Sequence, residues 1–67
     1  MNQRQIGKNI KQARENTDFT QADVAQKAEI NVNYYARIER GEVIPSMEVL
    51  EAILKILKVK SSDVLPF

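Results

Sequence analysis

Several chemically specialised residues are missing or scarce in this chain of 67 residues. Cysteine and histidine are both absent. Their absence excludes disulfides, cysteine–zinc sites and the side chain that most often acts as general base or metal ligand. The sequence has only two glycines and no clustered carboxylates, so a glycine-rich phosphate loop and a carboxylate-based catalytic site are not expected either. We therefore expect a protein that is not an enzyme and that holds neither a metal nor an organic cofactor.

The chain also has no long apolar run and no amino-terminal segment that joins a basic start to an apolar stretch. Such segments mark membrane spans and secretory signals, so a cytoplasmic protein without membrane contact is expected. The hydrophobic fraction of 43% and the charged fraction of 28% are typical of a folded globular chain. At this length a single small domain over residues 1–67 is predicted.

Positive and negative side chains are nearly equal in number, and the formal net charge is +1 at pH 7. Residues 1–40 are mildly basic, whereas residues 41–67 are mildly acidic. An ordinary scatter of surface charge explains such a small asymmetry as well as an anionic partner does. The nature of the partner therefore has to be inferred from residue patterns rather than from net charge.

Apolar residues at helical spacing predict an all-α protein. Ile6, Ile10 and Ala13 form one stripe of a first helix. Residues that favour the first position of a helix precede the next three helices: Thr20, Asn31 and Ser46. Gly41 is suited to end the third helix, because glycine readily adopts the left-handed conformation. The expected helices cover residues 3–16, 20–28, 31–40, 46–58 and 61–65, and they predict a compact five-helix bundle.

The fourth predicted helix is unusually apolar. Its apolar residues cover roughly 220° of the helical wheel at 100° per residue, whereas a surface helix needs an apolar stripe only a little wider than about 100°. This excess predicts a homodimer that forms through the fourth helix and the C-terminal segment, with Val64, Leu65 and Phe67 at the interface. The alternative is that these residues simply close the core of one small domain.

Residues 20–41, TQADVAQKAEINVNYYARIERG, predict two short helices joined by a tight turn. Asn33, Arg37 and Arg40 recur at i, i+4 and i+7 on the outward side of the second helix, and Val32 and Ala36 flank them. Asparagine pairs with adenine and arginine with guanine in the major groove, while small apolar groups contact the thymine methyl. A helix-turn-helix that reads DNA is therefore favoured over a helical hairpin that only packs.

Much of the chain carries a pattern that extends beyond these two helices. It includes IGKNIKQAREN (residues 6–16), FTQADVAQKA (19–28), RIERG (37–41), the Pro45–Ser46 pair and LKILKVKSSDVL (54–65). In these features the chain resembles the lambda-repressor-like, Cro-type helix-turn-helix family, also called the xenobiotic-response-element family. The resemblance implies a regulator of transcription, a repressor, whose third helix enters the major groove of double-stranded DNA at a pseudo-palindromic operator.

The resemblance also implies roles for individual residues. Gln21 would touch a phosphate or a base and brace the third helix. The residues implied to read bases are Asn31, Val32, Asn33 and Arg37. Tyr34 would contact phosphate, with core packing as a comparable alternative, and Arg40 would meet the DNA backbone. Arg14 in the first helix would pair with Glu39 at the end of the third, and this ion pair would serve stability rather than DNA contact.

The chain departs from the family pattern at several positions. Asp18 and Glu29 stand where the family often has glycine, and a strained or reshaped turn is expected because glutamate tolerates the left-handed conformation poorly. Tyr35 stands where the family usually has isoleucine or valine; packing at the edge of the core with its hydroxyl outward is favoured over a reach toward DNA. Glu42 lies in a loop expected to approach phosphate and would weaken that contact. Glu42 and the low net charge keep open an alternative function, an antitoxin-like or other protein-interaction module in which DNA binding is secondary.

Overall fold

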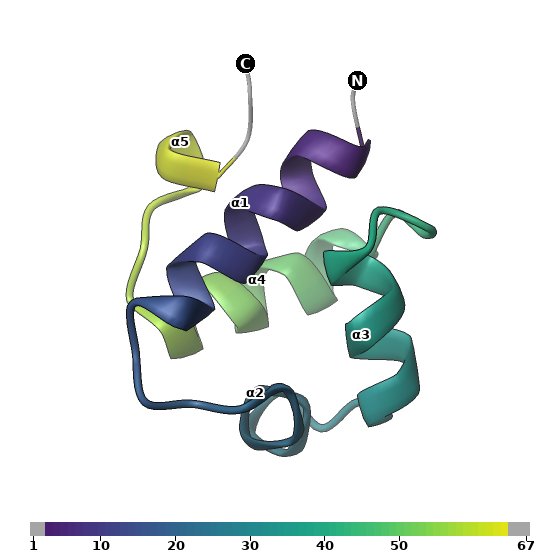
Figure 1. Ribbon diagram of the computed structural model, residues 1–67, viewed down its shortest axis with the longest axis vertical. Helices are drawn as coiled ribbons and strands as arrows, with labels where there is room; N and C mark the ends of the chain where they lie inside the picture. Colours follow the sequence, from purple (N-terminus) through teal and green to yellow (C-terminus); the bar gives the residue numbers. More distant parts are fainter. Residues whose placement is uncertain (1–2, 65–67) are drawn as a thin grey trace.

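The computed structural model describes residues 3–64, apart from the side chains of Ser61 and Asp63. This part of the chain contains α1 (Gln3–Glu15), α2 (Gln21–Lys27), α3 (Val32–Glu39), α4 (Met47–Leu57) and α5 (Ser61–Val64) (Figure 1). The predicted all-helical class is confirmed. Within the described range four elements are helices of at least seven residues, and α5 is a single helical turn of four residues. None of these helices is both long and apolar enough to cross a bilayer.

The helices are arranged around α1, which runs diagonally through the view in Figure 1. α3 packs on one side of α1 and α5 on the other, while α2 contacts both α3 and α4. All five elements contribute to one apolar core, whose buried members are Ile6, Ile10, Val24, Ala25, Tyr35, Ile38, Leu50, Ile53, Leu54, Leu57 and Val64. The core therefore holds α2 and α3, the two helices of the predicted motif, against the rest of the molecule.

A glycine lets α1 and α3 approach each other closely. A Cβ atom at Gly7 would overlap the carbonyl oxygen of Ile38 and would lie 2.7 Å from that of Glu39. A glycine inside a helix costs about 1 kcal/mol relative to alanine, and the close helix contact explains why this position nevertheless carries one. The contact brings the carboxyl end of α3 directly onto α1.

Side-chain caps define where the next three helices begin. The hydroxyl of Thr20 accepts a hydrogen bond from the Asp23 N–H at 3.1 Å, and the Asp23 carboxylate accepts one from the Thr20 N–H at 2.9 Å. This reciprocal pair is the predicted capping box. Asn31 caps α3 and Ser46 caps α4 in the same manner, each through its side-chain oxygen. The predicted capping residues of all three helices are thus confirmed, and each helix begins one residue later than its predicted range.

Three helices end in the same backbone motif. After α2, α3 and α4 the chain turns through a left-handed residue, which is Glu29 (φ 58°), Gly41 (φ 76°) and Lys58 (φ 58°) respectively. In each case the following N–H donates to a carbonyl five residues earlier: Ile30 to Ala25, Glu42 to Arg37 and Val59 to Leu54. This is the Schellman motif, in which glycine is the preferred residue at the left-handed position.

Of the two residues that stand where the family often has glycine, only one has its backbone in the left-handed region. Glu29 adopts the conformation that glutamate tolerates poorly, as expected. Asp18 does not have a positive φ angle, so its substitution for glycine causes no strain of this kind. The turn between α2 and α3 therefore contains a glutamate whose backbone is strained.

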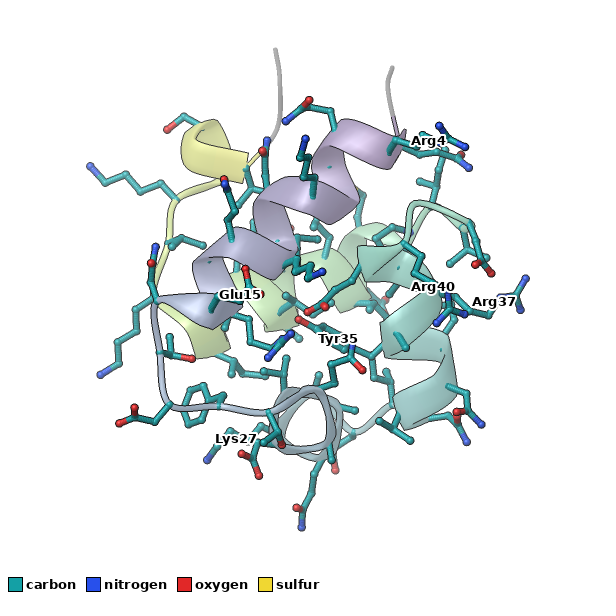
Figure 2. The ribbon with its side chains drawn as sticks, in the orientation of Figure 1. Arg4, Glu15, Lys27, Tyr35, Arg37 and Arg40 are labelled. Carbon is teal, nitrogen blue, oxygen red and sulfur yellow. The ribbon has the colours of Figure 1, made fainter. Side chains whose placement is uncertain are left out.

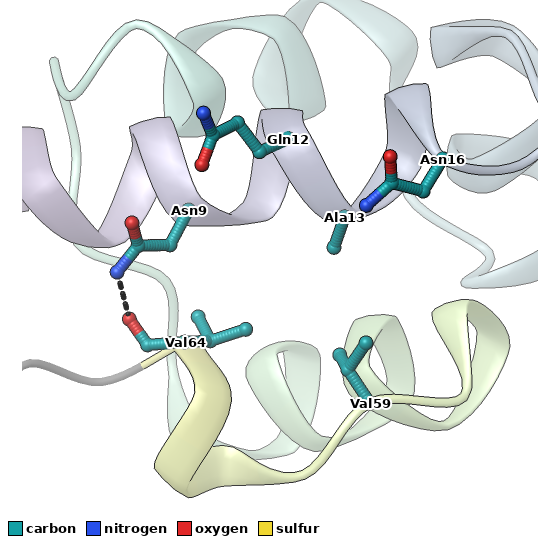
Figure 3. A pocket seen from close by; sticks show the side chains of 6 residues that line it. All are labelled: Asn9, Gln12, Ala13, Asn16, Val59 and Val64. Carbon is teal, nitrogen blue, oxygen red and sulfur yellow. Dashed lines mark hydrogen bonds between the residues drawn. The ribbon is translucent and has the colours of Figure 1, made fainter.

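The structure corrects part of the predicted dimer surface. Val64 is only 1% exposed, and its carbonyl oxygen accepts a hydrogen bond from the Asn9 side chain at 2.6 Å (Figure 3). Its side chain belongs to the core of one chain, so its assignment to a dimer interface is wrong. Of the eight apolar residues of α4, four are likewise buried within the chain and three are half-buried, whereas Met47 is 64% exposed. Leu65 and Phe67 lie outside the described residues.

A pocket of about 250 Å³ lies on the α5 side of α1 (Figure 3). Its lining is neutral and consists of Asn9, Gln12, Ala13, Asn16, Val59 and Val64. Because α3 packs on the other side of α1, this pocket is separate from the outward surface of the predicted recognition helix.

Relief of the strained turn gives a first prediction. The left-handed conformation costs a residue with a Cβ atom about 1–2 kcal/mol, while glycine loses about 0.5–1 kcal/mol more chain entropy on folding. We expect Glu29→Gly to raise the free energy of unfolding by up to about 1 kcal/mol, measured by urea denaturation. Glu29→Ala keeps the Cβ atom and serves as the control, with no comparable gain. A glycine variant less stable than the parent would contradict this account of the turn.

Candidate nucleic-acid interface

The third helix, α3, has one face in the core and one face in solvent. Tyr35, Ile38 and Glu39 are its buried residues. The predicted DNA-facing residues Asn31, Val32, Asn33, Arg37 and Arg40 are all exposed. Figure 2 shows Arg37 and Arg40 at the outer side of α3, with Tyr35 pointing inward. The structure thus gathers amide, apolar and basic groups on one outward surface, which we call the α3 face and define by these five exposed residues.

The amino-terminal end of the α3 face combines polar and apolar groups. The side-chain oxygen of Asn31 caps the helix by accepting from the Asn33 N–H at 2.7 Å, so a contact from Asn31 to a base would use its amide nitrogen. Val32 is 41% exposed. Asn33 is exposed beside it. An amide next to an exposed aliphatic group matches the edge of an A·T pair, which presents N6, N7 and the thymine methyl.

The two tyrosines of α3 have different surroundings. Tyr34 is half-buried and packs against the core, which supplies the packing contact that the sequence left as an alternative to a phosphate contact. Tyr35 is 0% exposed, so the expectation that its hydroxyl points outward is wrong. Its hydroxyl is buried without a hydrogen bond to any described residue. Burial, together with the nearby Glu39 carboxylate, raises the pKa of Tyr35.

A buried carboxylate joins the first three helices. The Glu39 side chain is 2% exposed, and its Oε2 atom lies 2.7 Å from Nε of Arg14. Its Oε1 atom accepts from the Gln21 amide at 2.9 Å and from a second Arg14 nitrogen at 3.3 Å. Arg14 also donates to the Phe19 carbonyl oxygen at 3.2 Å. The structure therefore brings together the two residues expected to pair, and it adds Gln21 as a third member.

The Glu39 carboxylate is held in its ionised form. Burial by itself raises the pKa of Glu39, but hydrogen bonds from Arg14 and Gln21 favour the charged state. These hydrogen bonds and the positive charge of Arg14 outweigh burial, so the pKa of Glu39 lies below its ordinary value. A charged and fully paired Glu39 links the end of α3 to α1 and to the beginning of α2.

Gln21 makes the bracing contact with the third helix that the family resemblance implies. Its amide nitrogen donates to Glu39 inside the protein. The same nitrogen carries a second N–H donor and the amide oxygen is an acceptor, so a contact of Gln21 with a phosphate or a base stays a prediction. In this conformation Gln21 braces α3 from α2. Its amide oxygen could accept a hydrogen bond only from a donor group such as a base amino group.

A second ion-pair cluster lies in solvent at the other end of the α3 face. Glu42 contacts Nε of Arg40 at 2.6 Å and Nε of Arg37 at 3.4 Å. All three side chains are about half exposed. The sequence placed Glu42 in the loop after α3 but did not predict that it would pair with both arginines. The only sequence signal is Gly41, whose left-handed turn reverses the chain immediately before Glu42.

The buried cluster predicts a large loss of stability when its acid is removed. Glu39→Ala leaves Arg14 without its carboxylate, and breaking a buried pair costs about 3–5 kcal/mol. We expect a loss of this size in the free energy of unfolding, measured by urea denaturation. Glu51→Ala, which removes an exposed acid from α4, is the matched control and should change stability by less than about 0.5 kcal/mol. Equal stabilities of the two variants would remove the structural role assigned to Glu39.

The lowered pKa of Glu39 predicts an acid-sensitive contribution to stability. Because the folded-state pKa lies below the ordinary value of 4.5, the contribution is complete above the unfolded-state pKa. It is lost as the pH falls through the folded-state pKa. We expect the parent to lose more unfolding free energy than Glu39→Gln between about pH 6 and about pH 3. Parallel pH profiles for the two proteins would contradict this expectation.

Comparison with known proteins relates this geometry to a family. A family model described as helix-turn-helix matches residues 10–64. The chain is 36% identical over 59 residues to the immunity repressor protein of Bacillus phage phi105, and the aligned region covers 88% of this chain and 41% of the phage protein. The chain therefore spans about two fifths of that relative. A shorter stretch of 35 residues is 49% identical to a probable translation initiation factor IF-2 of Methanocaldococcus jannaschii, covering 52% of this chain and 3% of that protein.

A solved structure supports the same fold. The clp gene regulator ClgR from C. glutamicum superposes with a TM-score of 0.90, covering 96% of this chain and 82% of that one. Its sequence identity is 22%, so this similarity concerns the fold alone. The match of the family model extends from the middle of α1 to α5 and contains the whole of α2 and α3. The chain therefore belongs to the helix-turn-helix family.

Proposed function

We propose that the protein is a sequence-specific DNA-binding regulator of transcription, a repressor, which places α3 in the major groove. The observation that carries this proposal is the α3 face, where base-matching amide and guanidinium groups project from a helix whose inner side is anchored through Glu39. Family membership supports DNA binding. The name of the phage relative, an immunity repressor, supports repression rather than activation.

The residues of the α3 face and its neighbours have distinct roles in this proposal. Those proposed to read base edges are Asn31, Val32, Asn33 and Arg37. Arg40 binds the phosphate backbone, and Tyr34 adds its hydroxyl there while its ring packs against the core. Such contacts with the phosphate backbone orient the helix without selecting a sequence. Gln21, Arg14 and Glu39 position α3 from within the protein.

We further propose that two copies bind one operator. A single module of this size buries little DNA surface, and dimers of such modules read two half-sites one helical turn apart. Met47 at the start of α4 and Ile44 just before it are 64% and 53% exposed. Large apolar side chains exposed so close together favour contact with another protein surface. The proposed interface comprises this end of α4 together with Leu65 and Phe67, and it excludes the buried Val64.

Selection from a random pool of DNA duplexes tests base reading. At about 0.15 M salt, near physiological ionic strength, we expect the parent to enrich a pseudo-palindrome. Arg37→Ala should relax the preference at one position of each half-site, because a good bidentate contact contributes about 1–3 kcal/mol of discrimination. Lys55→Ala removes an exposed positive charge from α4, and this control should keep the parent's preference.

The same selection contains the outcomes that would overturn the proposal. If the parent enriches no sequence, base reading by α3 is wrong, and a protein-interaction function becomes the better account. If Arg37→Ala selects the same sequence as the parent, Arg37 does not read a base. The mass of the complex on the selected duplex decides stoichiometry: two chains per duplex are expected, and a single chain would contradict the paired arrangement.

A further inference from the structure

One acidic side chain engages both arginines of the α3 face. Glu42 Oε2 lies 2.6 Å from Nε of Arg40, and Glu42 Oε1 lies 3.4 Å from Nε of Arg37 and 3.5 Å from a terminal nitrogen of Arg40. Both guanidinium groups stand at the outer edge of the molecule in Figure 2. A single carboxylate therefore bridges the two basic groups that the proposed function assigns to DNA.

The backbone holds Glu42 in this position. The left-handed Gly41 turns the chain back at the end of α3, and the Glu42 N–H donates to the Arg37 carbonyl oxygen at 2.9 Å. The Gly41 carbonyl oxygen also accepts from the Gln3 side chain at 2.8 Å, which ties the turn to α1. The carboxylate therefore starts from a backbone position that is fixed relative to the last turn of α3.

The Glu42 carboxylate and a DNA phosphate are both anions that bind the guanidinium groups of Arg37 and Arg40. Arginine binds both groups through its N–H donors, and the Nε donors of Arg37 and Arg40 already point at Glu42. A phosphate that approaches either arginine also meets the negative charge of Glu42. The hydrogen bonds from Arg40 and then Arg37, with the charges of both groups, hold the pKa of Glu42 below its ordinary value. Glu42 is therefore ionised at neutral pH.

We propose that Glu42 is a built-in counter-anion that competes with DNA for Arg37 and Arg40 and so limits affinity for any duplex. This inference rests on the proposed function and deepens it. In the free protein Glu42 occupies the two arginines, and in the complex they exchange this carboxylate for DNA. Because the three groups are exposed, the exchange is easy and the effect on affinity is moderate. Glu42 thus sets how much of the basic charge of the α3 face is available to a polyanion.

Substitution of Glu42 by an isosteric neutral residue tests the proposal. Glu42→Gln should bind an unrelated duplex roughly two- to fivefold more tightly than the parent. The slope of log affinity against log salt should steepen by up to about 0.9, the value for one additional phosphate contact. Glu51→Gln makes the same change in net charge from an exposed position on α4, and its smaller effect measures the contribution of net charge alone.

A second pair of variants shows whether the gain in DNA affinity from Glu42→Gln depends on the arginines. In an Arg40→Ala background the closest contact of Glu42 is absent, so the gain from Glu42→Gln should shrink. An undiminished gain would overturn the proposal, because the acid would then act on DNA without its partner. A loss of affinity in Glu42→Gln would also overturn it, because Glu42 would then be orienting the arginines productively.

Elution from immobilised heparin separates this inference from the proposed function. Heparin is a polyanion without bases, so it tests competition for the arginines independently of sequence reading. Glu42→Gln should elute at higher salt than Glu51→Gln. If this holds while the parent selects no DNA sequence, the counter-anion inference stands and base reading fails. If the two variants elute together while the parent selects an operator, base reading stands and the counter-anion inference fails.

Discussion

The orientation of the recognition helix depends on one buried carboxylate. Glu39 takes hydrogen bonds from Arg14 on α1 and from Gln21 on α2, so three helices meet at its two oxygen atoms. Burying a carboxylate and a guanidinium is costly, and only good geometry with further hydrogen bonds offsets that cost. Here the Arg14 contact at 2.7 Å and the Gln21 contact at 2.9 Å supply both. Because any tilt of α3 against α2 would break them, the cluster acts as an orientation constraint as well as a source of stability.

The adjacent residues Glu39 and Arg40 show how one short helix separates two kinds of charge. The Glu39 side chain is 2% exposed and paired within the protein, while Arg40 at the C-cap is exposed and pairs with the half-exposed Glu42 carboxylate. Buried pairs are weakly screened by salt, whereas exposed pairs are strongly screened. Raised salt therefore weakens the contacts of the outer surface but leaves the inner frame of the motif intact.

Features determined by a few neighbouring residues could be predicted from the sequence. The capping box at Thr20, the caps at Asn31 and Ser46 and the left-handed Gly41 each depend on contacts within five residues, and all four are present. The pairing of Arg14 with Glu39 spans 25 residues. Its expectation came from family resemblance, because spacing along the chain does not determine which side chains meet in the core.

The sequence did not predict contacts between residues that lie far apart along the chain. Tyr35 was expected at the core edge, but the packing around it leaves no exposure. Val64 was assigned to a second chain, but α1 covers it first. Gln21 was expected to touch a phosphate or a base and to brace the third helix; the sequence did not show that its bracing partner is Glu39, 18 residues away. In each case helical periodicity correctly identified a helix but could not determine what would lie against it.

The hydrogen bond from Gln3 to Gly41 has a practical consequence for anyone who modifies this chain. It places the first described residue of α1 beside the turn that carries Glu42, and a Cβ atom at Gly41 would lie only 2.7 Å from the Cα atom of Arg4. The beginning of the first helix and the edge of the α3 face are therefore neighbours in space. A charged label attached at Gln3 would therefore sit beside the turn that carries Glu42 and would itself alter the electrostatics of this surface.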